Sequence, residues 1–216
     1  MTFIRTPALR TVALAALLAA TLNACVPLVV GGAVVGGTLV ATDRRTSGAQ
    51  LEDEGIELRA ANRLREALIE RPHINITSYN RQVLLTGEVP TEADKQRAEQ
   101  IVSRVENVKS VLNELAVMGN STLTQRSSDT LITGRVRASF IDAKDLYANA
   151  FKVTTERSTV YLMGRVTQRE AERATEITRG ISGVQRVVRA FELISEEDLQ
   201  RTLPQPAPAA APKPAG

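Results

Sequence analysis

The chain has 216 residues, with 27 Lys and Arg against 24 Asp and Glu. Arg5 and Arg10 fall in the first 24 positions, which hold no acidic residue, so the remainder is balanced at 25 basic against 24 acidic residues. A balanced charge argues against the clustered basic surface that a general nucleic-acid binder needs. A chain without Trp and with 3% aromatic residues also lacks stacking platforms for single strands.

The first predicted element is a secretory signal peptide over residues 1–24. Arg5 and Arg10 precede an uncharged apolar run at residues 11–22, and the tetrapeptide Leu-Asn-Ala-Cys occupies positions 22–25. A basic start, a short apolar core and small residues before a cut are typical of such a signal. Cys25 is the single cysteine of the chain, so no intramolecular disulfide can form.

The end of this signal resembles a bacterial lipobox. The resemblance implies that Cys25 begins the mature protein and carries a diacylglycerol and an N-acyl lipid, with no other cofactor. Val26 stands where an aspartate tends to retain lipoproteins in the inner membrane, so the implied location is the periplasmic face of the outer membrane. An uncleaved membrane helix is the alternative, but Pro27 and the glycines at positions 31, 32, 36 and 37 disfavour a continuous helix.

The lipidated N-terminus and an apolar, Gly-rich tether are expected to occupy residues 25–50. Residues 26–41 are rich in Gly and Val and carry no charge, which favours a flexible segment close to the membrane. The spacing of Gly32 and Gly36 also fits the small-xxx-small pattern of dimerising membrane helices, a weak signal in so short a run.

The middle of the chain contains an internal repeat. Residues 78–89 (SYNRQVLLTGEV) run parallel to residues 155–166 (TERSTVYLMGRV). A threonine and an acid three positions later follow in each copy, which is typical of a capped helix start. Upstream, each copy has an apolar i, i+4 stripe that predicts a first helix. These stripes are Ile56, Ala60, Leu64 and Ala67 in the first copy and Ile132, Val136, Phe140 and Ala143 in the second.

Two short strands are predicted between the helices of each copy, at residues 74–78 and 82–86 and at residues 151–155 and 159–163, with hairpins at positions 80–81 and 157–158. A third strand follows the second helix, so each unit is α-β-β-α-β. Units this small bury little apolar area alone, and we expect the copies to stabilise each other by packing. The predicted domains are residues 51–118 and 128–194, with a linker at 119–127 and a disordered Pro/Ala-rich tail at 195–216.

The repeated unit resembles the BON domain in its apolar-Gly-x-Val strand end, its capped helix and its closing segment at residues 183–187 (GVQRV). Two such units behind a lipobox resemble the dual BON-domain outer-membrane lipoproteins, as do the segments ATDRR, DTLIT and VTTE that begin at positions 41, 129 and 153. The resemblance covers residues 25–194. It implies an α+β fold in which a small mixed sheet carries two helices on one face, and a protein that supports outer-membrane integrity at cell-division sites.

Catalysis finds no support in the sequence, and we predict no catalytic residue, no metal site and no enzyme. His73 is the single histidine and follows Pro72, a setting typical of a surface or capping group. One histidine and a modified cysteine exclude Cys–His catalysis and the usual zinc ligand sets. The acidic run at residues 52–54 is interpreted as solvated charge that favours the positive end of a helix.

Binding to a membrane surface is better supported. Residues 51–118 carry a net charge of −3 and residues 128–194 a net charge of +3, so the second domain alone is attracted to anionic lipid. Gly55 of the first helix corresponds to Leu131 of the second, which lies near Arg135 and Arg137. An apolar residue flanked by cations is how an interfacial helix meets a bilayer. The alternative is that Leu131 packs against the first domain.

The family resemblance implies that this first helix of the second domain binds anionic phospholipids, phosphatidylglycerol and cardiolipin. The positions carried over are Thr130, Leu131, Ile132, Arg135, Val136 and Ser139. The chain departs from the pattern at Leu131, where the family member that it resembles has tryptophan, and at Gly134, which weakens a helix by about 1 kcal/mol relative to alanine. The rival hypothesis is a non-catalytic adaptor that docks onto envelope-assembly or division proteins or cell-wall enzymes. The sequence identifies neither the partner nor the oligomeric state.

Overall fold

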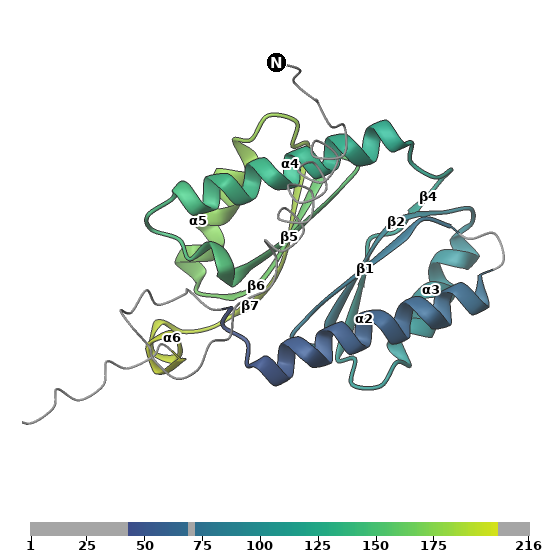
Figure 1. The fold of residues 1–216 in the computed structure, drawn as a ribbon, viewed down its shortest axis with the longest axis horizontal. Coiled ribbons are helices and arrows are strands. Elements are labelled where there is room, and N and C mark those ends of the chain that lie inside the picture. The colour runs from purple at the N-terminus through teal and green to yellow at the C-terminus, as the bar shows by residue number, and fades with distance from the viewer. Residues whose placement is uncertain (1–42, 69–71, 203–216) are drawn as a thin grey trace, which may run out of the picture. The chain divides into compact units, whose positions relative to one another are not determined.

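The computed structural model describes residues 43–68 and 72–202. The signal peptide, Cys25 and most of the tether lie outside the described residues, as does the end of the tail. The first copy contains α2 (Ser47–Ala67), β1 (Ile74–Tyr79), β2 (Gln82–Val89), α3 (Glu92–Ser103), β3 (Ser110–Asn113) and β4 (Ala116–Val117). The second contains α4 (Leu123–Asp142), the 3-10 turn η1 (Ala148–Ala150), β5 (Phe151–Glu156), β6 (Thr159–Val166), α5 (Gln168–Arg179) and β7 (Arg186–Leu193), and α6 (Glu196–Thr202) follows (Figure 1).

Both copies have the predicted α-β-β-α-β order and a small mixed sheet. In each sheet the central strand pairs antiparallel with the strand before it and parallel with the strand after α3 or α5. The third strand is continuous in β7 but divided into β3 and β4 in the first copy. The hairpins turn where the sequence predicts, and all four turn residues have positive φ, the geometry of a tight type I′ turn. They are Asn80 (φ 49°), Arg81 (φ 71°), Arg157 (φ 50°) and Ser158 (φ 59°).

A buried aspartate on the first helix of each copy holds the hairpin. The Asp53 carboxylate accepts the backbone N–H groups of Asn80 and Arg81, each at 2.7 Å. Asp129 accepts those of Arg157 and Ser158 at 2.8 and 2.9 Å. Asp53 is 1% exposed, so the interpretation of the 52–54 run as solvated charge is wrong at this position. The carboxylate satisfies donors that the turn would otherwise leave unpaired in a buried place.

Each copy has its own core, and the two sheets then pack on each other. The helices α2 and α3 cover one face of the first sheet, and α4 and α5 cover one face of the second (Figure 1). The other faces of the sheets meet in a third cluster, formed by Tyr79, Leu84, Tyr161, Met163 and Ala190, with Leu112 and Val188 against it. The helices therefore lie on the outside of both sheets, and the expected mutual packing occurs through the strands.

Gly87 and Gly164 occupy matching positions on the central strands because the chain passes too close for a side chain. A Cβ atom at Gly87, which has φ of 112°, would lie 2.0 Å from the carbonyl oxygen of His73. A Cβ atom at Gly164 would lie 2.5 Å from the carbonyl oxygen of Ala150. Close backbone approach accounts for both residues.

The capping pair predicted at the start of the second helix forms completely in the second copy and in part in the first. Thr167 and Glu170 form a full capping box, in which each side chain accepts the other residue's backbone N–H. Thr91 accepts the N–H of Asp94, but the Asp94 side chain is one methylene shorter than Glu170 and instead accepts the Thr91 hydroxyl. A further capping box joins Thr122 and Gln125, so α4 begins at Leu123 and residues 123–127 of the expected linker are helical.

The start of the C-terminal tail is ordered, which corrects the prediction of disorder from residue 195. Residues Glu196–Thr202 form α6. The Ser195 hydroxyl oxygen accepts the Asp198 N–H at 3.0 Å at its first turn, and Leu199 is 4% exposed. An acidic first turn favours a helix start, and one buried leucine secures the short helix to the rest of the chain. The Pro/Ala-rich residues 203–216 lie outside the described part.

Candidate functional site

The proposed lipid-binding helix α4 lies on the outside of the second sheet. Ile132, Val136 and Phe140 point into the core between α4 and the sheet, and each is at most 2% exposed. The first copy packs on the opposite face of that sheet, through the strands. The outward side of α4 is therefore turned away from the first copy, except at Thr130, which lines a pocket together with His73 and Asn75 of that copy.

The structure divides the six predicted lipid-binding residues. Thr130, Leu131 and Arg135 are exposed, and Ser139 is half-buried. Leu131 is 62% exposed and belongs to none of the core clusters, so the alternative in which it packs against the first domain does not hold in the described residues. Ile132 and Val136, at 2% and 0% exposure, are in the core and cannot contact a bilayer in this fold, which corrects their assignment. Their i, i+4 spacing is that of the core stripe.

The exposed side of α4 is apolar or small along its length. Besides Leu131, the helix exposes Leu123 (79%) and Ile141 (73%). At about 100° per residue, Leu123 and Ile141 project in the same direction and Leu131 about 80° away. The small residues Gly134 and Ala138 are exposed between these directions. We call the surface formed by Leu123, Thr130, Leu131, Gly134, Ala138 and Ile141 the α4 face.

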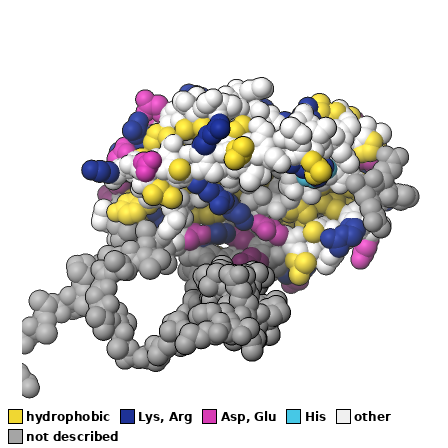
Figure 2. All heavy atoms as spheres, turned by 45° about the horizontal axis from the view of Figure 1, so that its top comes forward, with side chains coloured by type: hydrophobic (Ala, Val, Ile, Leu, Met, Phe, Trp, Pro, Cys, Tyr) yellow, Lys and Arg dark blue, Asp and Glu magenta, His cyan; other side chains and the backbone are white. Residues whose placement is uncertain are grey.

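Basic residues border the α4 face on both sides. Arg135 and Arg137 are exposed and donate to the backbone carbonyls of Ser182 (3.2 Å) and Val153 (3.5 Å). Carbonyl partners leave the guanidinium charge uncompensated, whereas carboxylate partners would neutralise it. Figure 2 turns the α4 side toward the viewer, and hydrophobic side chains (yellow) and basic ones (dark blue) are interspersed there. Between Leu123 and Ile141, the one carboxylate of the helix is the buried Asp129.

The equivalent helix of the first copy is a natural comparison. Helix α2 also exposes leucines, Leu51 (71%) and Leu58 (64%), so comparing Gly55 with Leu131 alone understates its apolar surface. The difference lies in charge. Glu54 is exposed between the two leucines, and Arg59, the counterpart of Arg135, forms an ion pair with Glu52 at 2.6 Å. Carboxylates on the face of α2 are repelled by anionic headgroups, whereas the exposed carboxylate of α4, Asp142, lies at the C-terminal end of that helix.

The segment that leads from the tether is tied to the second copy by Arg44. Its guanidinium forms two hydrogen bonds with the Glu170 carboxylate, both at 2.7 Å, and donates to the carbonyl of Arg165 at 3.1 Å. The two side chains are 7% and 0% exposed. Burial alone would raise the pKa of Glu170, but the hydrogen bonds from Arg44 and from the Thr167 N–H hold it below its usual value. The pair is a buried, bidentate ion pair.

The next residue, Arg45, ties the same segment to the first copy. It donates to the buried Asp53 carboxylate at 2.6 Å and lies over the ring of Tyr79 at 4.2 Å. Tyr79 in turn accepts the backbone N–H of Arg165, from the second copy, at 3.1 Å. Two consecutive arginines thus contact one domain each, and we call this arrangement the arginine clip. It secures the start of the folded part at the junction of the two domains.

Replacing Arg44 with methionine is expected to destabilise the folded chain by about 3–5 kcal/mol, because Glu170 stays buried without its cation. The double variant Arg44→Met/Glu170→Gln removes both charges and should recover much of that loss. Urea denaturation at pH 7 measures both changes. The difference from the parent should shrink as the pH falls through the lowered pKa of Glu170, where protonation removes the ion pair. A loss below 1 kcal/mol for Arg44→Met would contradict the clip.

Among the residues that the structure describes, no helix has both the length and the apolar character needed to cross a membrane.

Comparison with known proteins finds a family model and related sequences that together match most of the chain. The family model of the BON domain matches residues 52–119 and 128–195. Outer membrane lipoprotein DolP of Haemophilus influenzae is 39% identical over 186 residues, which cover 84% of this chain and 95% of that protein. The 21 kDa hemolysin of Actinobacillus pleuropneumoniae is 30% identical over 154 residues, 70% of this chain and 79% of that protein.

One solved structure that the comparison matches is the C-terminal domain of CdsD, a structural protein of the type III secretion system of Chlamydia trachomatis. It is 13% identical in sequence and has a TM-score of 0.28. The alignment covers 62% of this chain and 96% of that one. So low a score bears on neither fold nor function.

Proposed function

This chain belongs to the BON-domain family, and we propose that it is an outer-membrane lipoprotein, anchored through Cys25 on the periplasmic side, whose α4 face binds anionic phospholipid. In this proposal it supports the integrity of the outer membrane, with cell-division sites as its place of action, an expectation that rests on the family resemblance. Phosphatidylglycerol and cardiolipin are the anionic lipids concerned.

The anchor is supported by the N-terminal sequence and by the related protein. A signal peptide that ends in Leu-Asn-Ala directly precedes Cys25, the single cysteine. The Haemophilus influenzae protein, 39% identical over most of its length, is named an outer-membrane lipoprotein. Acyl chains on Cys25 would hold the protein at the membrane surface, where a second, weaker contact becomes effective.

The observation that carries the lipid proposal is the α4 face itself. Three large apolar side chains are exposed on one helix, exposed arginines border them, and no exposed carboxylate interrupts the face from Leu123 to Ile141. Insertion of apolar side chains beneath flanking cations is the physical basis of interfacial binding. Helix α2 has similarly exposed leucines, but the exposed carboxylate of Glu54 lies between them.

The matched pair Arg135→Glu and Arg59→Glu tests the proposal, with residues 43–202 cosedimented with vesicles. The parent should bind phosphatidylglycerol vesicles and leave phosphatidylcholine vesicles free. Arg135→Glu removes an attraction worth about 1 kcal/mol and adds a repulsion, so affinity should fall tenfold or more at low salt. The defect should shrink as salt screens it. Arg59→Glu should change binding little, because Arg59 is paired with Glu52.

Equal losses for the two variants, or parent protein that binds neither kind of vesicle, would favour the adaptor hypothesis. In that case the α4 face would be a docking surface for an envelope protein. Circular dichroism of each variant separates a loss of binding from a loss of folding.

A further inference from the structure

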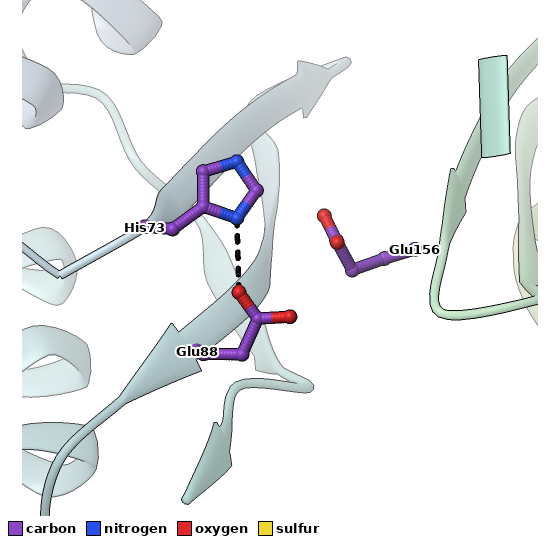
Figure 3. Close-up of side chains that lie close together, drawn as sticks. All are labelled: His73, Glu88 and Glu156. Carbon is purple, nitrogen blue, oxygen red and sulfur yellow. Dashed lines mark hydrogen bonds and ion pairs between the residues drawn. The ribbon is translucent and has the colours of Figure 1, made fainter. Parts of the chain in front are cut away.

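A histidine and two glutamates from both domains meet at the junction between them (Figure 3). His73 precedes β1, Glu88 is on β2, and Glu156 ends β5 of the second copy. One possible ligand atom from each of the three lies within 4.8 Å of the other two. The glutamates are 0% and 5% exposed. The sequence could not bring these residues together, because they lie far apart along the chain and on different domains.

The two carboxylates differ in how well they are compensated. Glu88 accepts the N–H of Ser121 at 3.1 Å, contacts His73 Nδ1 at 3.0 Å and has Arg157 at 3.4 Å. Burial would raise its pKa, but these hydrogen bonds hold it below the usual value. The hydrogen-bond partner of the Glu156 carboxylate is the neutral amide of Asn75, at 2.8 Å.

Glu156 therefore lacks a counter-charge of its own. Within the described residues, no Lys or Arg forms an ion pair with it, and burial raises its pKa. A buried carboxylate without a cation is costly, and proteins resolve this by protonation, by pairing or by binding a metal. An imidazole and a second carboxylate beside it are ligands that zinc accepts.

From this geometry we infer that His73, Glu88 and Glu156 form a site for a divalent cation of the zinc type, which joins the two BON domains. Zinc bonds of about 2.0–2.1 Å place neighbouring ligands of a tetrahedron roughly 3.3 Å apart. His73 Nδ1 and Glu88 Oε2 already lie 3.0 Å apart, so Glu156 is the ligand that must close in, by about 1.5 Å at most.

A place for the fourth ligand lies next to the cluster. A pocket of about 370 Å³ is lined by His73, Asn75 and Glu156 and, from α4, by Arg126, Asp129, Thr130 and Thr133. A water molecule from this pocket would complete four-coordination. The bound ion would connect two ligands of the first domain with one of the second, and would hold the domain junction closed beside α4.

Zinc binding to the protein purified from membranes in detergent tests the site, after thiol titration shows that Cys25 offers no free thiol. The probe is Zn²⁺ added after chelator treatment, followed by gel filtration and elemental analysis. We expect about one zinc per chain. At a free zinc concentration 100 times the Kd, the melting temperature should rise by about 5–10 °C.

Glu156→Gln is the informative variant, because the amide keeps the size of the side chain and removes the buried charge. It should melt no lower than the parent without metal, and it should lose both the bound zinc and the rise in melting temperature. Glu114→Gln is the matched control, since Glu114 pairs across the same junction with Arg186 at 2.8 Å but lies outside the cluster. It should bind zinc as the parent does.

Three results would overturn the site: a parent that retains no zinc, zinc binding that survives in Glu156→Gln, or a melting temperature that zinc leaves unchanged.

Discussion

The variant Cys25→Ser is expected to lose all acylation and to leave the outer-membrane fraction. Cys25 is the single cysteine of the chain, so no second thiol can take the lipid. Serine is close in size but its hydroxyl does not replace the thiol in forming the thioether. Labelling with a radioactive or clickable fatty acid, followed by membrane fractionation, measures both effects. Unlabelled Cys25→Ser protein that remains in the outer membrane would contradict the lipoprotein proposal.

The consequence for lipid binding should be as large as the change in location. Cys25 and Asp43 are 18 positions apart, a stretch that spans at most about 60 Å when fully extended. The arginine clip secures the end of that stretch to both domains. In the proposed function, the anchor raises the effective concentration of the α4 face at the bilayer and so strengthens the lipid contact beyond that of a free protein.

Patterns of short range along the chain account for what the sequence predicted well. The hairpin residues 80–81 and 157–158, the core stripe at Ile56, Ala60 and Leu64, and the order of elements depend on neighbours a few positions away. The split of β3 and β4 and the helix α6 escaped prediction. A buried leucine lies at each place, Leu115 between β3 and β4 and Leu199 in α6, and composition does not reveal that either is buried.

The functional residues that sequence reasoning missed depend on distant partners. Arg44 meets Glu170 across 126 positions, and His73 meets Glu156 across the domain boundary. The internal repeat contained one pattern that could have revealed a buried structural residue. Asp53 and Asp129 occupy the same register ahead of the same hairpin, and a carboxylate that recurs in both copies points to a structural partner. The predicted lipid-binding residues were carried over from the family pattern along the whole helix. They included the buried Ile132 and Val136 because the pattern does not distinguish the exposed face of the helix from the buried one.

Leu131 is the position at which we expect the largest effect on lipid binding, and Leu131→Glu should abolish it. Burying a leucine side chain in an apolar environment is worth about 1.5–3 kcal/mol, and Leu131 is 62% exposed before it binds. The new carboxylate adds repulsion from anionic headgroups, worth about 1 kcal/mol. Together these effects should lower affinity for phosphatidylglycerol vesicles by about 30-fold or more, below detection for a weak binder.

Leu58→Glu is the matched control for this change. Leu58 is 64% exposed on α2, so the substitution removes the same side chain, adds the same charge and carries a similar cost for the fold. It should leave vesicle binding close to that of the parent, because α2 already exposes carboxylates. Circular dichroism should show both variants folded, since neither leucine belongs to a core cluster.

The same position also allows a change in the opposite direction. Leu131→Trp places an amphipathic ring, which favours the headgroup level of a membrane, at the centre of the α4 face, and should raise affinity for anionic vesicles. A contact made by insertion must weaken with Leu131→Glu and strengthen with Leu131→Trp. Folded Leu131→Glu that binds anionic vesicles as well as Leu58→Glu does would show that the lipid contact lies elsewhere, and the α4 face would then be open to a protein partner.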